Sequence, residues 1–283
     1  MSGVKGAKAC YTHTAASIYP YKLILHLLSK VVKEGANLQT RTPVTSVSDK
    51  PLLDGRWLVT TDRGSVKAKK VIFATNAYTS SLAPQFRGHI VPNRGVCSRI
   101  VCPEGSTPPY LPNTYSVRYG PQVFDYLIPR PDGSIIVGGG KQTYWADLSN
   151  FYDVADDSKL IEPAKSYFDG LMQRNFIGWE NSGAYTQRVW SGIMGHSSDY
   201  TPYVGNVPGK PNQLIVAGFS GHGMPNIFLS AKGVAQMVLH GTAFEHTGVP
   251  SVFKVTEERL ASTKKNELLE GWKKDVGYHQ SKL

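Results

Sequence analysis

The 283-residue sequence lacks several features that would assign it to a special class of protein. It has only three cysteines, Cys10, Cys97 and Cys102, and no CxxC pair, which argues against a disulfide framework or a zinc site. No apolar run is long enough to span a bilayer, and the N-terminus has no signal-peptide core. We therefore expect no metal site, no membrane span and a reducing or organellar interior.

The basic residues form no concentrated patch along the sequence. The net charge is +10, but the lysines and arginines are scattered and no basic run is interleaved with aromatic residues. This distribution gives little support to nucleic-acid binding. Hydrophobic residues make up 41% of the chain and charged residues 18%, so the composition is that of a folded chain rather than a disordered one.

The glycine fingerprint of dinucleotide-binding proteins is also missing. That fingerprint is GxGxxG, placed after a strand and at the start of a helix. The cluster Gly138-Gly139-Gly140 lacks the spacing, and nothing before Pro20 could supply a buried strand followed by a phosphate-binding turn. The sequence therefore predicts that the usual pyrophosphate cradle is absent.

Hydrophobic periodicity gives a coarse plan of the chain. It predicts a helix from Pro20 to Glu34, and a strand buried on both faces at 71–74. From Gly88 to about Gly140, short β-rich runs separated by proline and glycine predict an antiparallel sheet. Residues 157–176 are a predicted helix. Residues 255–276 predict a charged helical tail that packs weakly or not at all.

The strongest local signal is a strand, a glycine-rich turn and a helix between Leu214 and Leu239. Glycines at 218, 221 and 223 would let the backbone approach a ligand closely. The free N–H groups at the start of the helix suit an electron-rich or anionic ring edge. On spacing alone, a tight turn that needs small residues explains the pattern equally well.

Several segments carry a family resemblance in a fixed order, and the ordered set is more specific than any one motif. They are Ala16–Lys22, Thr42–Val44, Val71–Tyr78, Pro92–Gly95, Asp125–Gly133, Trp190–Met194 with Asp199, Pro202 and Gly205, and Gly218–Met224. Together they resemble the FAD-dependent oxidoreductases of the D-amino-acid oxidase superfamily, in the branch of the sarcosine, pipecolate and fructosyl-amine oxidases.

The resemblance implies an α/β (α+β) fold. An incomplete FAD/NAD(P)-binding Rossmann-like domain would be interleaved with an antiparallel β-sheet substrate domain. Residues 1–87 and 206–250 would form the partial FAD-binding domain, and residues 88–205 the substrate domain. Residues 251–283 would form a helical tail.

The resemblance also implies a chemistry: oxidation of the C–N bond of an amine or amino acid by hydride transfer to FAD, with O2 as the expected acceptor. FAD would be bound non-covalently, because Gly192 stands near the position where some relatives tether it through cysteine. Sarcosine oxidases place an oxygen-activating lysine where this chain has residues 134–136, and Lys141 is the nearest lysine. The expected cofactor-binding residues are Val44, Ala74, Thr75, Gly192, Gly218, Gly221, His222, Gly223 and Met224.

No residue is assigned as catalytic from the sequence, because hydride transfer demands no strong base and the protein's task is orientation and electrostatics. Three substrate-side candidates have structural alternatives. Arg94 could pair with a substrate carboxylate or with a structural acid. Tyr126 could line the substrate cavity or belong to the sheet core. His196 could face the substrate or be a hydrogen-bonded loop histidine.

The sequence ends in Ser281-Lys282-Leu283, the tripeptide that the peroxisomal import receptor reads. We therefore expect a peroxisomal location, and a cytoplasmic one otherwise. Two alternatives to the oxidoreductase remain open at this point. The chain could be a cofactor-free descendant that uses the old cavity for binding, isomerisation or cyclisation, or it could be an inactive truncated form.

Overall fold

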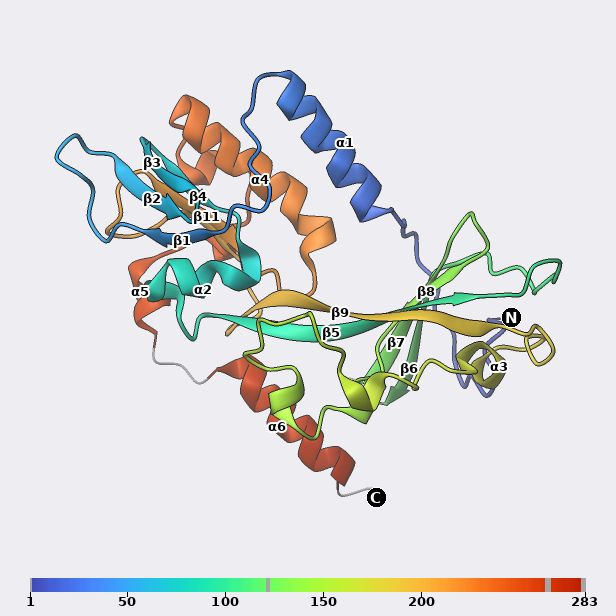
Figure 1. Cartoon of the computed structure of the whole chain (residues 1–283). Helices are drawn as coiled ribbons and strands as arrows, with labels where there is room; N and C mark the ends of the chain where they lie inside the picture. Colours follow the sequence, from blue (N-terminus) through green and yellow to red (C-terminus); the bar gives the residue numbers. More distant parts are fainter. Residues whose placement is uncertain (1, 121–122, 263–265, 281–283) are drawn as a thin grey trace. The chain divides into compact units, whose positions relative to one another are not determined.

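The computed structural model describes residues 2–120, 123–262 and 266–280, and the chain forms two compact units. The first comprises residues 1–42, 96–143 and 162–190, and the second residues 43–95, 144–161 and 191–283. The longer elements (Figure 1) are helices α1 (Pro20–Lys33), α2 (Thr79–Leu82), α3 (Leu171–Asn175), α4 (Gly223–His240), α5 (Glu257–Ala261) and α6 (Glu267–Gln280), with strands β1 (Val44–Val47), β2 (Trp57–Thr61), β3 (Gly64–Ala68), β4 (Val71–Phe73), β5 (Ile90–Val101), β6 (Tyr115–Gly120), β7 (Val123–Pro129), β8 (Ile135–Gly138), β9 (Tyr185–Ser197), β10 (Tyr203–Asn206) and β11 (Gln213–Ala217).

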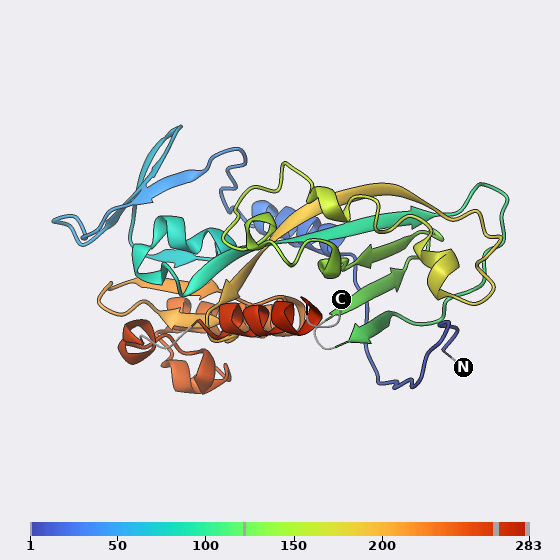
Figure 2. The ribbon, with the colours of Figure 1, turned by 90° about the horizontal axis from the view of Figure 1, so that it is seen from below.

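The first unit contains the antiparallel sheet that the sequence predicts. Its strands follow the order β6-β7-β8-β5-β9, and β6 with β7, β7 with β8 and β8 with β5 pair antiparallel. Figure 2 shows β6, β7 and β8 beside one another. The pairing places Cys97, Gly138 and Tyr126 in one row across β5, β8 and β7. The mixture of helices with antiparallel sheets agrees with the expected α/β (α+β) class.

The cluster of three glycines at the end of β8 has a steric explanation. A Cβ atom at Gly138 would collide with the ring of Tyr126, and one at Gly139 would collide with the carboxylate of Asp125. Two neighbouring side chains of β7 thus lie across the backbone of β8, which must be bare there. These glycines serve the packing of the sheet, in line with their lack of a nucleotide-binding spacing.

The buried carboxylate of Asp125 is surrounded by donors. It accepts hydrogen bonds from the hydroxyls of Tyr167 (2.6 Å) and Tyr119 (3.1 Å) and from the N–H of Gly140 (2.9 Å). Burial first, and then the bond to the carboxylate, raise the pKa of Tyr167, so this hydroxyl remains a donor. The network satisfies a buried anion and fixes the loop that follows β8.

The second unit is built around a small mixed sheet. β11 lies between β10, its antiparallel partner, and β4, its parallel partner. All five residues of β11 are buried, and α4 packs against this strand. Strands β1, β2 and β3 form a separate antiparallel sheet. Apolar side chains from β4, β5, β10 and β11 make one core cluster, which includes Phe73, Ile90, Tyr203 and Ile215.

Two sequence-based expectations about this unit and its neighbour are wrong. β4 was expected to be buried on both faces, but it is an edge strand and the side chain of Ile72 is 46% exposed. The helix expected over residues 157–176 reduces to a 3-10 turn at Glu162–Ala164 and the short helix α3. Pro163 and Gly170 lie inside that segment, and both interrupt helices. Helix α1 was expected and is present, although none of its residues is buried.

The domain boundaries expected from the sequence refer to flavin-binding and substrate-binding roles, and they stay a prediction. None of the described helices combines the length and the apolar character needed to cross a bilayer.

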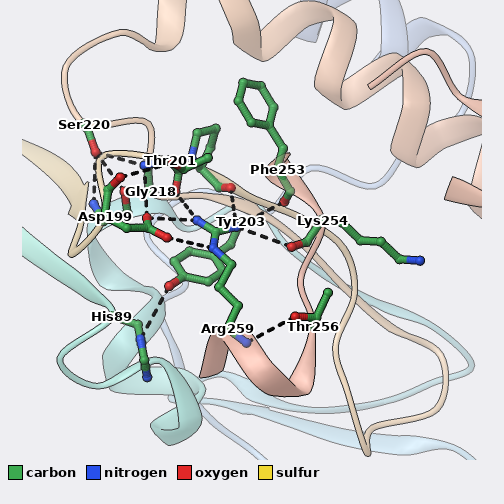
Figure 3. A network of polar contacts seen from close by, with 12 residues as sticks. His89, Asp199, Thr201, Tyr203, Gly218, Ser220, Phe253, Lys254, Thr256 and Arg259 are labelled. Carbon is green, nitrogen blue, oxygen red and sulfur yellow. Dashed lines mark hydrogen bonds and ion pairs between the residues drawn. The ribbon is translucent and has the colours of Figure 1, made fainter. Parts of the chain in front are cut away.

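The C-terminal segment was expected to pack weakly, and the structure corrects this. Arg259 of α5 forms a two-pronged ion pair with Asp199, with Nε–Oδ2 and Nη2–Oδ1 distances of 2.9 and 3.0 Å (Figure 3). It also donates to the carbonyl oxygens of Thr201 and Pro202, and its guanidinium lies 3.7 Å from the ring centroid of Tyr203. This clamp is not apparent from the sequence, because its two partners are sixty residues apart.

Asp199 is charged because of Arg259. Burial pushes the pKa of its carboxyl up, but the hydrogen bonds and the charge of Arg259 outweigh burial and hold the pKa below its usual value. A carboxyl whose pKa is lower in the folded state stabilises the fold at pH values above its unfolded pKa of about 4. That stabilisation is lost as the pH falls through the folded-state pKa.

Replacing Arg259 with Met should lower the free energy of unfolding by about 1.5–3 kcal/mol, the usual range for hydrogen bonds to a charged group. Urea unfolding at pH 7 and at a series of pH values below 4 measures this difference, which should shrink in acid. The matched control is R56M. Both side chains of the Arg56–Asp54 ion pair are exposed, so its loss should change the free energy of unfolding little. Equal stability of R259M and R56M at pH 7 would contradict the clamp.

Candidate functional site

The glycine-rich turn lies where a ligand site is expected in a parallel sheet. β4 and β11 run parallel, so their carboxyl ends meet at the same edge of the small sheet. Ligands of open α/β sheets bind outside this edge. β4 ends before Thr75 and Asn76, and β11 ends before Gly218. The residues expected to bind the cofactor at positions 74, 75 and 218–224 are therefore brought together at one edge.

The turn itself has a backbone that glycine makes possible. Gly218 and Gly221 have φ angles of +80° and +79°, and Ser220 between them has a φ of +51°. Residues other than glycine rarely adopt this left-handed backbone region, because their Cβ atom comes too close to the following carbonyl oxygen. The turn then runs directly into α4. Thus the glycines at 218 and 221 are required by the path of the chain, as the sequence suggested.

A polar joint that the sequence did not reveal fixes the turn. Oδ1 of Asn76 accepts the N–H of Gly218 at 2.9 Å. The N–H of Ser220 donates to the carbonyl oxygen of Gly195 at 2.9 Å, and the hydroxyl of Ser220 accepts the N–H of Ser197 at 3.1 Å. The ends of β4, β9 and β11 are thereby tied together. The available signal was the polar pair Thr75-Asn76 directly after an apolar run.

The far side of the turn presents backbone donors to the surroundings. Gly221 and His222 are exposed, and the side chain of Met224 is 55% exposed. The N–H groups of Gly223 and Met224 open the helix and have no intrahelical acceptor. The side chain of His222, the N-cap residue, makes no capping hydrogen bond and instead contacts the carbonyl of Ser220.

This geometry fits the cofactor that the resemblance implies. Exposed N–H groups at the start of an 18-residue helix carry partial positive charge and suit an electron-rich ring edge. The turn is open at Gly221, where an added Cβ would have only one heavy atom within 4 Å, the sulfur of Met194 at 3.9 Å. At Gly218, which is buried, an added Cβ would contact the side chains of Ile90 and Ser197 at 3.4 and 3.5 Å. A surface hollow lined by residues 206–212 lies at the opposite end of the β10–β11 hairpin and belongs to its turn.

Met194 is a further member of the site that the sequence left without a role. Its side chain is 37% exposed and lies between two glycines. Its sulfur faces Gly221, and its terminal methyl would stand 3.1 Å from a Cβ at Gly95 on β5. A flexible, polarisable thioether thus borders the turn. In the sequence, only the nearness of Met194 to Gly192, an expected cofactor residue, pointed to it. Gly192 lies on the same strand, and an added Cβ there would have no heavy atom within 4 Å.

Two expected cofactor residues, Ala74 and Val44, are far from the turn in the sequence. In the structure, one lies at the same sheet edge as the turn and the other lies in a different sheet. Ala74 is exposed directly after β4, at the same sheet edge as the turn. Val44 begins β1, in the separate three-stranded sheet of this unit. Neither residue offers a polar side chain, so their roles would rest on the backbone. Their part in cofactor binding stays a prediction.

The three substrate-side candidates are in unequal positions. Arg94 donates to the carbonyl oxygens of Asn150, Asp156 and Lys159, at 2.7–3.2 Å, and so braces the 150–159 loop. His196 is buried and its Nδ1 lies 3.3 Å from Nδ2 of Asn93. Of the two, His196 stands closer in sequence to Met194 and the turn.

Tyr126 belongs to the first unit. It is 40% exposed, and its hydroxyl lies 3.0 Å from the sulfur of Cys97 across Gly138. Burial raises the pKa of the Cys97 thiol, and the bond to Tyr126 offsets part of this rise. The Cys97 thiol therefore stays protonated at physiological pH. The part of Tyr126 in a substrate cavity stays a prediction.

Replacing Asn76 with Ala should loosen the glycine turn. The N–H of Gly218 would lose its acceptor, at a cost of about 1–3 kcal/mol in unfolding free energy. Faster amide hydrogen exchange at Gly218 and Ser220 would report the local effect. N76D is the matched control, since Asp also accepts this bond and tolerates the positive φ of 40° at this position. Exchange in N76A as slow as in N76D would show that the joint does not hold the turn.

Comparisons with known proteins bear on the family and the fold of the chain. The model of the family described as "FAD dependent oxidoreductase" (DAO) matches residues 2–237. The probable oxidoreductase OrdL of Rhizobium meliloti (strain 1021) is 24% identical over 222 residues, which are 78% of this chain and 47% of that protein. Mitochondrial dimethylglycine dehydrogenase of Mus musculus is 25% identical over 248 residues, which are 79% of this chain and 26% of that protein.

Solved structures show the same fold. Glycine oxidase from Geobacillus kaustophilus superposes with a TM-score of 0.62 at 19% identity, over 83% of this chain and 57% of that one. L-proline dehydrogenase from P. horikoshii gives a TM-score of 0.58 at 21% identity, over 82% of this chain and 57% of that one. The chain spans about half the length of the OrdL protein and a quarter of the dehydrogenase from mouse. Since the family model covers most of its residues, the chain belongs to the FAD-dependent oxidoreductase family.

Proposed function

We propose that this chain takes part in the oxidation of the C–N bond of an amine or amino acid, with FAD as the non-covalently bound cofactor. The observation that carries the proposal is the glycine turn at the carboxyl edge of β4 and β11. It leads into α4, whose first N–H groups, at Gly223 and Met224, have no intrahelical acceptor. Family membership supports the cofactor, and the turn supports its place in this chain.

The described residues suggest how the chain would hold the flavin. Gly218 and Gly221 allow the backbone to approach the ring, and the N–H groups of Gly223 and Met224 would face its electron-rich edge. FAD, when bound, supplies the acceptor for a hydride from the substrate carbon. Donors aimed at that edge would stabilise the negative charge that reduction places there, by the electrostatic logic of an oxyanion hole.

The substrate class is supported by the relatives. Those with solved structures include a glycine oxidase and an L-proline dehydrogenase, and a curated relative is a dimethylglycine dehydrogenase. These names support an amine or amino acid as substrate. We propose O2 as the electron acceptor. We do not assign Arg94 to a substrate carboxylate, because backbone carbonyl groups already accept from its nitrogens.

Flavin binding tests the proposal directly. The purified chain, incubated with FAD and freed of excess by gel filtration, should be yellow and should release FAD on denaturation. Gly221→Ala should weaken FAD binding about tenfold, because a Cβ at positive φ distorts the turn. The matched control is G209A, at a φ of +69° in the β10–β11 turn with open space around it. Both variants carry a similar backbone strain of about 1–2 kcal/mol.

The outcomes separate the hypotheses. Weaker FAD binding in G221A with normal binding in G209A supports the flavin site at the turn. Equal binding in both variants would refute that placement. A colourless but cooperatively folding chain would favour the cofactor-free alternative, and a chain that only aggregates would favour the inactive truncated form.

We also propose a peroxisomal location, read from Ser281-Lys282-Leu283 by the import receptor, with the cytoplasm as the alternative. These three residues lie outside the described part of the structure. A fluorescent protein fused ahead of the full chain should colocalise with a peroxisomal marker, and removal of residues 281–283 should release it to the cytosol. The same distribution with and without the tripeptide would sink this proposal.

A further inference from the structure

The C-terminal helix α6 brings an aromatic residue, Trp272, to the end of β9, where His196 lies. The indole of Trp272 packs against three rings of the second unit. Its centroid lies 5.0 Å from that of Phe151, 5.5 Å from that of Tyr152 and 6.0 Å from that of His196, each pair with tilted, edge-to-face geometry. Such pairs are favourable beyond the area that they bury. Trp272 is therefore seated on the buried candidate residue His196.

Polar contacts at the start of α6 hold the helix in this place (Figure 2 shows α6 in red). Asn266 precedes the helix, and its side chain makes two hydrogen bonds. Its Oδ1 accepts the N–H of Leu269 at 3.0 Å, as an N-cap does, and its Nδ2 donates to the hydroxyl of Tyr152 at 2.8 Å. The N–H of Glu267 donates to the carbonyl oxygen of Ser198 at 3.0 Å. These contacts set the direction from which Trp272 reaches His196.

The pair under Trp272 includes a polar group with unmet hydrogen-bonding capacity. Asn93 is 4% exposed, and its Nδ2 lies 3.3 Å from Nδ1 of His196. Its Oδ1 is buried without a hydrogen-bond partner among the described residues. If the amide of Asn93 were rotated by 180°, its oxygen would face the His196 ring and its nitrogen would lack a hydrogen-bond partner instead. Such a buried group is costly, and functional sites are one place where this cost is retained.

This pair lies beside the glycine turn. Met194, which borders Gly221, and His196 are two residues apart on β9, and their partners Gly95 and Asn93 are two residues apart on β5. Side chains two apart on a strand point to the same face. The face of β5 and β9 that carries Met194 toward the turn therefore continues into the pair of Asn93 and His196, and ends beneath Trp272.

We propose that Trp272 is a positioning residue of this site: docked by α6, it holds the His196 ring on Asn93 and keeps water from the pair at the end away from Met194. The inference rests on the proposed function only for the statement that this face belongs to a flavin site. The seating of His196 is a property of the chain itself. On this proposal, the C-terminal helix α6 contributes to the site by positioning His196.

The test is the accessibility of individual histidines in the full chain, without added FAD. Diethyl pyrocarbonate labels exposed imidazoles, and mass spectrometry of the peptides gives a rate for each. His196 should react much more slowly than the exposed His222. In Trp272→Ala its labelling rate should rise about tenfold, while W272F retains the protection because a ring remains. The matched control is K273A, an exposed neighbour on the same helix. His89 serves as an internal reference for unfolding.

Each outcome decides the inference. Faster labelling of His196 in W272A, with His89 unchanged and W272F protected, supports it. Labelling of His196 in the parent chain as fast as that of His222, or no change in W272A, overturns it. If W272A also exposes His89, then N266A decides, because it removes the tether to Tyr152: unchanged His196 labelling there overturns the inference.

A parallel titration with FAD judges the proposed function separately. A chain that protects His196 through Trp272 but binds no FAD keeps the positioning role and refutes the flavin proposal. A chain that binds FAD should show a change in the absorbance bands of the bound flavin in W272A and not in K273A or W272F. Identical bands in all three would refute the link between Trp272 and the cofactor's surroundings.

Discussion

The hydrogen bond between the side chain of Asn76 and the N–H of Gly218 is the constraint on which the candidate site depends. It joins the carboxyl ends of two parallel strands that are 142 residues apart in sequence. Without it, the glycine turn would have several paths available, because glycine restricts the backbone least. With it, the donors at the start of α4 have a fixed direction. A ligand that these donors bind then meets a preorganised surface, and little ordering cost remains at binding.

The same logic explains which predictions from the sequence held. The strand of β11, the glycine turn and α4 follow from local pattern, because a buried strand, positive φ angles and an amphipathic helix are properties of short segments. The antiparallel sheet of the first unit also follows from short β-rich runs separated by glycine and proline. The resemblance in ordered segments added the family, and the comparison with the family model confirmed it.

The failures have local and long-range causes. Whether Ile72 is covered depends on what packs beside β4, and an apolar run cannot tell this. The segment at 157–176 has helical periodicity, but two of the neighbouring carbonyl groups, those of Asp156 and Lys159, accept from the distant Arg94. The C-terminal tail is charged on average, and its packing depends on two residues, Arg259 and Trp272, whose partners are far away in sequence. Long-range contacts therefore decided the packing of the C-terminal tail, whereas Pro163 and Gly170 interrupt the 157–176 segment locally.

The free edge of β4 has a practical consequence for work with this chain. A parallel edge strand with an exposed isoleucine leaves N–H and C=O groups ready to pair with another strand, and few charged residues stand on it to prevent this. Exposed apolar residues on α4, Phe228 and Leu229 among them, add to the tendency. The concentration and temperature at which the chain is kept will therefore set its association state, and light scattering belongs beside every binding measurement.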